Sequence, residues 1–168
     1  KQNKKKSYIT NVMGTKNLLK SIKQTKKKIF LFFPSTSHVY SFSKKPITEK
    51  DLTLPISYYG KTKLLAEREI RLYKNKNFEY FIGRIFSIFN RNQKKPFLYP
   101  TVKYRIKKMK SKKIYIKNAN CVRDFTNAEK LIKIILQIYK KKLSGTYNIG
   151  SGKGTSIKEF IYKFKQKY

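Results

Sequence analysis

Ile29-Phe30-Leu31-Phe32-Phe33 is an unbroken apolar stretch that is too short for a helix and is followed by Pro34. It predicts a strand that is buried on both faces, as in a parallel sheet, and that ends at Pro34. The next residues, 35–40, contain several hydroxyl groups. We expect them at the carboxyl end of the strand, where open α/β sheets bind their ligands.

The segments on either side of this strand alternate between helical and strand patterns. Before it, apolar residues in 7–24 recur at close to helical spacing, with lysines on the other side. After it, residues 41–55 have no periodicity and contain two prolines, which predicts a surface loop. A helix from Tyr59 to about Tyr73 and a buried strand over 79–86 follow. The order helix, strand, helix, strand predicts an α/β fold with parallel crossovers.

The second half of the chain has a less regular pattern. We expect a basic helix over 104–110, a short strand over 113–117 and a short strand over 145–150. Thr126 and Glu129 have the spacing of a capping box, and they precede apolar residues that share one helix face: Leu131, Ile134, Ile135 and Ile138. Ser156 with Glu159 caps a last helix. Residues 150–155 lack the Gly-Lys-Ser/Thr spacing of a phosphate loop, so we interpret them as a tight turn rather than a phosphate-binding loop.

The composition favours a folded protein of one domain's size and leaves a nucleic-acid partner as a weaker alternative. The 168 residues carry a formal net charge of +34, which could attract a polyanion. The lysines, however, are scattered over almost every segment rather than collected on one face. No apolar segment is long enough to span a membrane. The single cysteine, Cys121, and the absence of a Cys and His cluster suggest a reducing cytoplasm and no metal site.

Tyr59 and Lys63 stand four residues apart in the predicted helix, so both side chains share one face. An ammonium near a phenol favours the phenolate, which makes the two residues a candidate proton-transfer pair. Bringing a tyrosine pKa from about 10 to about 7 requires roughly 4 kcal/mol, more than one surface lysine supplies. A cationic cofactor would have to contribute. On these two residues alone, an amphipathic helix with a half-buried tyrosine is the simpler interpretation.

A series of motifs runs in order along nearly the whole chain: Asn11-Val12-Met13-Gly14-Thr15-Lys16-Asn17-Leu18-Leu19, Phe33-Pro34-Ser35-Thr36-Ser37-His38-Val39-Tyr40, Pro46-Ile47-Thr48-Glu49, Tyr59-Gly60-Lys61-Thr62-Lys63-Leu64-Leu65-Ala66-Glu67, Arg84-Ile85-Phe86-Ser87-Ile88-Phe89, Val122-Arg123-Asp124-Phe125 and Tyr147-Asn148-Ile149-Gly150-Ser151-Gly152. Together they resemble the extended short-chain dehydrogenase/reductase superfamily, the NAD-dependent sugar-nucleotide epimerases, dehydratases and reductases. The resemblance implies a partial doubly wound, Rossmann-like parallel sheet that lacks its first strands. It also implies a division into 1–93, the nucleotide-binding part, and 94–168, part of a small α/β substrate-binding region interleaved with the first.

The resemblance also implies roles for individual residues. Tyr59 is the acid/base on a sugar hydroxyl or carbonyl, Lys63 binds the nicotinamide ribose and lowers the tyrosine pKa, and Thr36 binds the reacting sugar oxygen. Asn11 faces an NAD or NADP cofactor. Arg123 pairs with the diphosphate of a nucleotide sugar, with a salt bridge to Asp124 as the alternative, and Ser87 stands where many members contact substrate phosphate. A homodimer through the helices that contain residues 11 and 59 is expected for the full-length protein.

Departures from the family narrow the function. Ser37 and His38 replace the Asp-Glu pair of the 4,6-dehydratases, so dehydration is not expected, and His38 is interpreted as a packing or turn residue. The glycine-rich turn that binds the cofactor pyrophosphate is missing, as are the strands around it. We expect a fragment that binds NAD weakly or not at all by itself. The sequence thus predicts a 4-epimerase or 4-keto-sugar reductase, with a basic nucleic-acid-binding module and an inactive fragment as alternatives.

Overall fold

The computed structural model describes residues 3–73, 75–90, 92–108 and 115–165. They form two compact units, which are described separately. The first contains the described residues of Lys1–Ile85 and Leu136–Ile149, and the second those of Phe86–Ile135 and Gly150–Tyr168. The functional division that was predicted at residue 93 stays a prediction.

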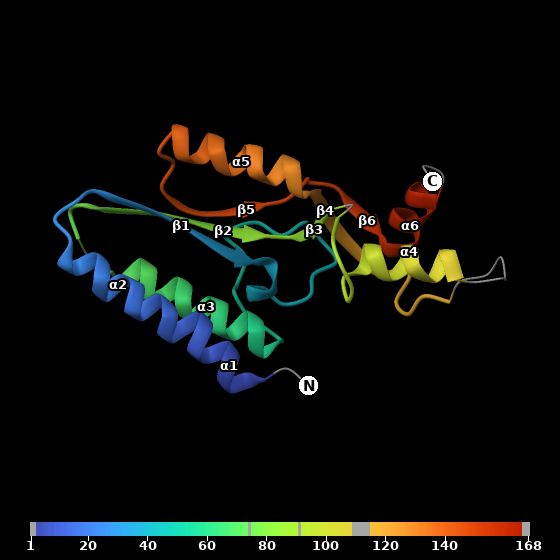
Figure 1. Cartoon of the computed structure of the whole chain (residues 1–168), viewed down its shortest axis with the longest axis horizontal. Helices are drawn as coiled ribbons and strands as arrows, with labels where there is room; N and C mark the ends of the chain where they lie inside the picture. Colours follow the sequence, from blue (N-terminus) through green and yellow to red (C-terminus); the bar gives the residue numbers. More distant parts are fainter. Residues whose placement is uncertain (1–2, 74, 91, 109–114, 166–168) are drawn as a thin grey trace. The chain divides into compact units, whose positions relative to one another are not determined.

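The first unit is built on a parallel sheet. Strand β1 (Ile29–Thr36) pairs with β2 (Phe78–Ile85), and β2 pairs with β5 (Gly145–Ile149). Helices α2 (Gly14–Gln24) and α3 (Tyr58–Leu72) lie on one face, and the end of α5 (Ala128–Lys140) lies on the other (Figure 1). The core on the α2 and α3 side consists of Leu19, Ile22, Ile70 and Ile82. The predicted α/β fold with a parallel sheet is confirmed.

Strand β1 differs from its prediction in two ways. It continues through Pro34 to Thr36, so the end predicted at Pro34 is wrong. Proline is tolerated because β1 lies at the edge of the described sheet, with β2 on one side. The apolar residues 29–33 are half-buried rather than fully buried, since the described elements cover this edge strand only in part.

The helix predicted over 7–24 is helical throughout but is not regular. It consists of α1 (Lys4–Tyr8), a π-helical turn η1 (Ile9–Met13) and α2. The loop predicted over 41–55 has no helix or strand. Helix α3 begins at Tyr58, one residue before its predicted start, because the Ser57 hydroxyl caps it by accepting from the Gly60 N–H at 3.0 Å.

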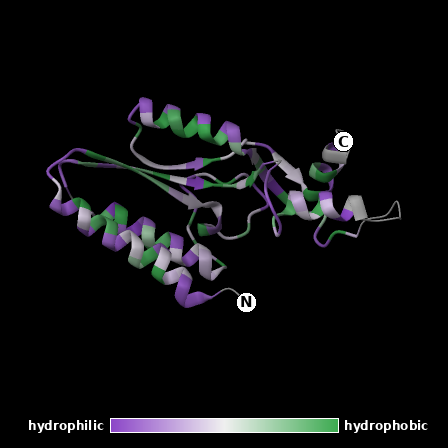
Figure 2. Ribbon diagram, viewed as in Figure 1, coloured by the Kyte–Doolittle hydropathy of each residue, from purple (hydrophilic) through white to green (hydrophobic). Residues whose placement is uncertain are grey.

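The second unit contains a mixed sheet of β3 (Ser87–Phe89), β4 (Val122–Asn127) and β6 (Gly154–Ser156). Strand β4 is parallel to β3 and antiparallel to β6. Helices α4 (Leu98–Lys108) and α6 (Ile157–Lys165) belong to this unit. The ring of Phe160 stacks on Phe125 with centroids 4.0 Å apart. Figure 2 shows hydrophilic residues on the helices of both units, in keeping with the scattered lysines.

Two predictions for the segment after residue 97 need correction. Helix α4 begins at Leu98, six residues before its predicted start, because Pro100 falls in the first turn, where proline is tolerated. The strand predicted over 113–117 is wrong for 115–117, which are not in a strand; Tyr115 is 86% exposed, and residues 113 and 114 lie outside the described residues. Residues 109–110 of the predicted helix also lie outside them.

The two helix caps of this region had different outcomes. Asn127 caps α5 by accepting from the N–H groups of Glu129 and Lys130, so the cap predicted at Thr126 is wrong. Thr126 is buried in β4 instead. The second cap is confirmed, because the Ser156 hydroxyl accepts from the Glu159 N–H at 3.1 Å and the Glu159 carboxylate accepts from the Ser156 N–H at 2.9 Å.

Candidate functional site

The candidate site starts where β1 ends. Thr36 is the last residue of the strand and is buried, and its hydroxyl accepts from the His38 N–H at 3.3 Å, which caps a 3₁₀ turn η2 (Ser37–Val39). This turn packs directly on the first turn of α3. A Cβ atom at Gly60 would lie 2.0 Å from the His38 carbonyl oxygen, so only glycine permits this approach.

Tyr59 and Thr36 are brought together by this packing. Burial raises the pKa of Tyr59 above its usual value, and a hydrogen bond with the Thr36 side chain opposes that rise. The His38 ring meets the Tyr59 ring edge-on, with centroids 6.1 Å apart. The structure therefore brings the Tyr59 phenol into contact with the Thr36 hydroxyl at the end of β1.

Lys63 lies one turn after Tyr59 and reaches the same end of β1. Its ammonium group donates to the Pro34 carbonyl oxygen at 2.7 Å and lies 4.5 Å from the centroid of the Phe33 ring. Burial lowers the pKa of Lys63, and the charge of Glu67 opposes that change. The structure therefore places a cation at the carboxyl edge of the sheet. The lowering of the Tyr59 pKa by Lys63 stays a prediction.

Asn11 supports α3 from the π-helical turn. Its amide nitrogen donates to the Thr62 hydroxyl at 2.9 Å, and that hydroxyl donates to the Tyr59 carbonyl oxygen at 2.9 Å. The Thr15 hydroxyl donates to the Asn11 carbonyl oxygen at 2.7 Å. π-Helical turns often occur at functional sites, and this one aims an amide at the turn that carries Tyr59. A contact between Asn11 and a cofactor stays a prediction.

Ser87 and Arg123 belong to the second unit. Ser87 begins β3 and stands opposite Phe125 of β4, and Arg123 of β4 stands opposite Thr155 of β6. The Arg123 side chain is exposed. Within the described residues, the ion pairs do not include one between Arg123 and Asp124, so the alternative role that the sequence left open for Arg123 is not found.

The Asp124 carboxylate instead fills the glycine-rich turn. It accepts from the Ser151 N–H at 2.7 Å and from the Gly152 N–H at 2.8 Å. A Cβ atom at Gly150 would lie 2.5 Å from Asp124 Oδ2. The turn is thus a structural element whose amide groups already have an anionic partner. This agrees with its interpretation from the sequence as a tight turn.

A buried ion pair, which was not predicted from the sequence, lies behind the site. Glu67 of α3 is fully buried, and its carboxylate accepts from Arg84 Nη2 of β2 at 2.8 Å and from Arg71 Nη1 at 3.0 Å. The Ser35 hydroxyl donates to the same carboxylate. Glu67 and Arg84 both lie in motifs that resemble the family, but the resemblance implied no role for either residue. A buried charge must be paired, and a glutamate on the inner face of an amphipathic helix was the available signal.

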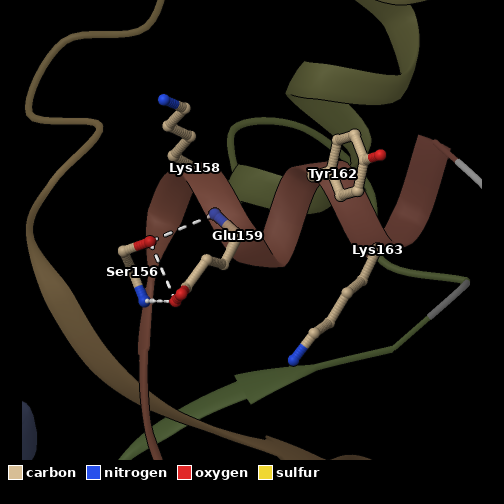
Figure 3. Close-up of a pocket in the computed structure, with 5 residues that line it drawn as sticks. All are labelled: Ser156, Lys158, Glu159, Tyr162 and Lys163. Carbon is tan, nitrogen blue, oxygen red and sulfur yellow. Dashed lines mark hydrogen bonds between the residues drawn. The ribbon is translucent and has the colours of Figure 1, made fainter.

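A surface pocket of about 400 Å³ occurs elsewhere, at the start of α6. Figure 3 shows its lining, in which Ser156 and Glu159 are engaged in the helix cap and Lys158, Tyr162 and Lys163 complete the surface. None of the predicted site residues lines it. Among the residues that the structure describes, no group of three or more His, Cys, Asp or Glu side chains could hold a metal ion. None of the helices formed by the described residues combines the length and the apolar composition that a membrane-spanning helix needs.

Comparisons with known proteins identify the family and agree with this fold. A family model described as GDP-mannose 4,6 dehydratase matches residues 2–167. The UDP-glucose 4-epimerase of Mycoplasma pneumoniae is 30% identical over 177 residues, which cover 90% of this chain and 52% of that protein. The GDP-6-deoxy-D-talose 4-dehydrogenase of Aggregatibacter actinomycetemcomitans is 29% identical, with 89% of this chain and 51% of that protein covered.

A solved structure shares this fold. The UDP-glucuronic acid 4-epimerase of Bacillus cereus, crystallised with UDP-glucuronic acid and NAD, is 28% identical and superposes with a TM-score of 0.81, covering 94% of this chain and 51% of that one. This chain spans about half the length of the relatives that it matches. The family match covers nearly every residue, and the parallel sheet carries the Tyr59 helix at its carboxyl edge. This chain therefore belongs to the GDP-mannose 4,6-dehydratase family of the extended short-chain dehydrogenases/reductases.

Proposed function

We propose that the protein containing this chain transfers hydride between NAD or NADP and the C4 position of a nucleotide sugar, as a 4-epimerase or a 4-keto-sugar reductase. The observation that carries the proposal is the contact of Thr36 with Tyr59, one helical turn from the Lys63 ammonium group, at the carboxyl end of β1. The relatives whose names include 4-epimerase and 4-dehydrogenase support chemistry at that carbon.

The described residues fit one end of a nicotinamide dinucleotide. Lys63 offers an ammonium group to a ribose hydroxyl, and it is now satisfied by a backbone carbonyl that a ligand could replace. The turn at residues 150–152 does not fit the diphosphate, since Asp124 takes its amide hydrogens. When bound, NAD or NADP supplies the acceptor or donor of the hydride.

The residues of this chain would manage the proton that accompanies the hydride. Oxidation of a sugar hydroxyl removes a hydride from carbon and a proton from oxygen, so the site must take up that proton, and reduction must return it. Thr36 holds the sugar oxygen beside Tyr59. The raised pKa of Tyr59 keeps the phenol protonated, which is the state that reduction of a keto sugar needs. Oxidation needs the phenolate, which the nearby Lys63 cation favours.

In the second unit, we propose that Arg123 binds the substrate diphosphate and that Ser87 contacts the same ligand. The exposed guanidinium of Arg123, with no ion pair to Asp124, supports this role, because bidentate pairing with phosphate suits arginine. Dehydration of the sugar is not part of the proposal, since Ser37 and His38 offer no carboxyl group at the positions that precede Val39.

The test is a pair of neighbouring substitutions, Tyr59→Phe and Tyr58→Phe, in the full-length protein. Tyr58 lies on the same helix turn, with its ring near Lys4, and has no part in the proposed chemistry. Conversion of a sugar nucleotide to its C4 epimer or to its reduced product, followed by chromatography, would measure hydride transfer, because an epimerase returns the hydride and causes no net change in the nicotinamide. Loss of the acid/base should lower the rate by about 100-fold or more, whereas Tyr58→Phe should retain the wild-type rate. A Tyr59→Phe enzyme within tenfold of wild type would refute the role of Tyr59.

We also propose a homodimer through the helices that contain residues 11 and 59. Three apolar side chains on η1 and α2 are exposed, Ile9 at 52%, Met13 at 40% and Leu18 at 45%. Placing a charge among them by Ile9→Glu should shift the full-length protein from dimer to monomer in analytical ultracentrifugation. Tyr115→Glu, at an exposed site in the second unit, is the control that should stay dimeric. A monomeric wild type would contradict the proposal.

A further inference from the structure

The Arg84 guanidinium holds two partners at once. Its Nε and Nη2 groups donate to the Glu67 carboxylate of α3, and its Nη1 group donates to the Tyr40 hydroxyl at 2.7 Å. Arg84 is 4% exposed and Tyr40 is 3% exposed. Because a guanidinium is planar and rigid, its two edges fix the helix and the segment after β1 relative to each other.

Tyr40 carries the connection further, to strand β5. Its hydroxyl donates to Asn148 Oδ1 at 2.9 Å. The Asn148 side-chain amide donates to the Ile47 carbonyl oxygen at 3.1 Å, and the Asn148 N–H donates to the Glu49 carboxylate at 2.6 Å. The set Glu67, Arg84, Tyr40 and Asn148, called here the buried network, therefore ends on the loop of residues 41–56.

The buried network has little freedom to rearrange. Glu67, Arg84 and Tyr40 are buried, so breaking a hydrogen bond among them leaves a polar group unsatisfied, whereas Asn148, at the end of the network, is half-buried. The network also joins four parts of the fold, since its members come from α3, β2, the segment after η2, and β5. It therefore couples α3 to the loop that leads back into the Ser57 cap of the same helix.

Lys63 and Tyr59 lie one and two turns before Glu67 on α3. We propose that Arg84, Tyr40 and Asn148 are positioning residues, which act through Glu67 to hold α3, and with it Tyr59 and Lys63, at the carboxyl edge of the sheet. The catalytic part of this inference rests on the proposed function. The coupling of α3 to the loop does not, because it is a property of the fold.

The experiment compares Tyr40→Phe with Tyr80→Phe in the full-length protein. Tyr40→Phe removes the hydroxyl that joins Arg84 to Asn148 and keeps the ring in place. Tyr80 is a half-buried tyrosine of β2 that packs on the apolar core outside the buried network, so it is a matched control. Backbone hydrogen exchange is measured at Asn148 and at Lys63, and kcat and KM are measured separately for hydride transfer.

For Tyr40→Phe we expect exchange to accelerate by about tenfold at both positions, because loss of a hydrogen bond in the middle of the network loosens both ends. We expect kcat to fall by about tenfold with KM within twofold, since misplacement of an acid/base lowers the rate more than the affinity. Tyr80→Phe should leave all four values within twofold.

Exchange that accelerates at Asn148 but not at Lys63 would reduce the network to a local structural role and overturn the proposal. So would a Tyr40→Phe protein that behaves like the control. If wild type transfers no hydride to a sugar nucleotide, the proposed function fails, and the exchange at Lys63 alone still decides whether the network positions α3.

Discussion

Replacing Gly60 with alanine should break the contact between η2 and α3 and destabilise the fold, whereas the same change at Gly14 should stabilise it. Both glycines are helical, Gly60 in α3 and Gly14 at the start of α2. A Cβ atom at Gly60 would lie 2.0 Å from the His38 carbonyl oxygen and 2.8 Å from its carbon. At Gly14 the nearest atom, the Ile9 carbonyl oxygen, would lie at an ordinary 3.7 Å.

The two effects can be compared in magnitude. Alanine in place of glycine stabilises a helix interior by about 1 kcal/mol, and this gain applies at both positions. Overpacking costs about 1–3 kcal/mol or more, and at Gly60 the obstructing atoms are backbone, which cannot change rotamer. We therefore expect Gly14→Ala to add about 0.5–1 kcal/mol to the free energy of unfolding and Gly60→Ala to remove about 2 kcal/mol.

Urea denaturation, followed by circular dichroism, measures both variants against wild type. Nuclear magnetic resonance of the Tyr59 ring gives a second measurement, because displacement of η2 should weaken the hydrogen bond between Thr36 and Tyr59. A Gly60→Ala protein that is as stable as Gly14→Ala, with an unchanged Tyr59 ring environment, would refute the packing argument.

Three further predictions concern carboxylates that accept several hydrogen bonds. Glu67→Gln should lower the free energy of unfolding by about 3–5 kcal/mol, because it leaves Arg84 buried without a counter-charge. The control Glu69→Gln, which removes an exposed ion pair, should lower it by less than about 1 kcal/mol. Urea denaturation measures both variants. Burial alone would raise the pKa of Glu67, but hydrogen bonds from Arg84 and Ser35 hold it below its usual value. Its stabilisation is therefore present above about pH 4.3 and is lost as the pH falls through the folded-state pKa, so acid titration should destabilise wild type more steeply than Glu67→Gln. Asp124→Ala should lower stability by about 1–3 kcal/mol in thermal unfolding, since two turn N–H groups lose their acceptor, and an unchanged unfolding temperature would contradict that role.

The sequence was sufficient for those features that depend on short spacings. The four-residue step from Tyr59 to Lys63 places both on one helix face, and the apolar run at residues 29–33 predicted a strand in a parallel sheet, which the structure contains. The hydroxyl-containing residues after that run were expected at the carboxyl end of the strand, and the structure places Thr36 there, as the last residue of β1.

Features that depend on distant pairings were not predictable in the same way. Tyr40 and Asn148 are 108 residues apart, and Arg84 and Glu67 are 17 apart on different elements, so no local pattern identifies them as partners. The continuation of β1 through Pro34 is compatible with its place at the edge of the described sheet. These outcomes are set by tertiary packing, which overrides local preference.

The filled turn at residues 150–152 has a consequence for how ligands compete. Asp124 is tied to that turn by the chain itself, and a tethered group acts at an effective concentration in the millimolar range or above. A free diphosphate at micromolar concentration would have to displace it. The glycines of this turn therefore form a site for an anion that the chain itself provides. We expect that a variant without the Asp124 carboxylate would leave the turn N–H groups available to bind phosphate.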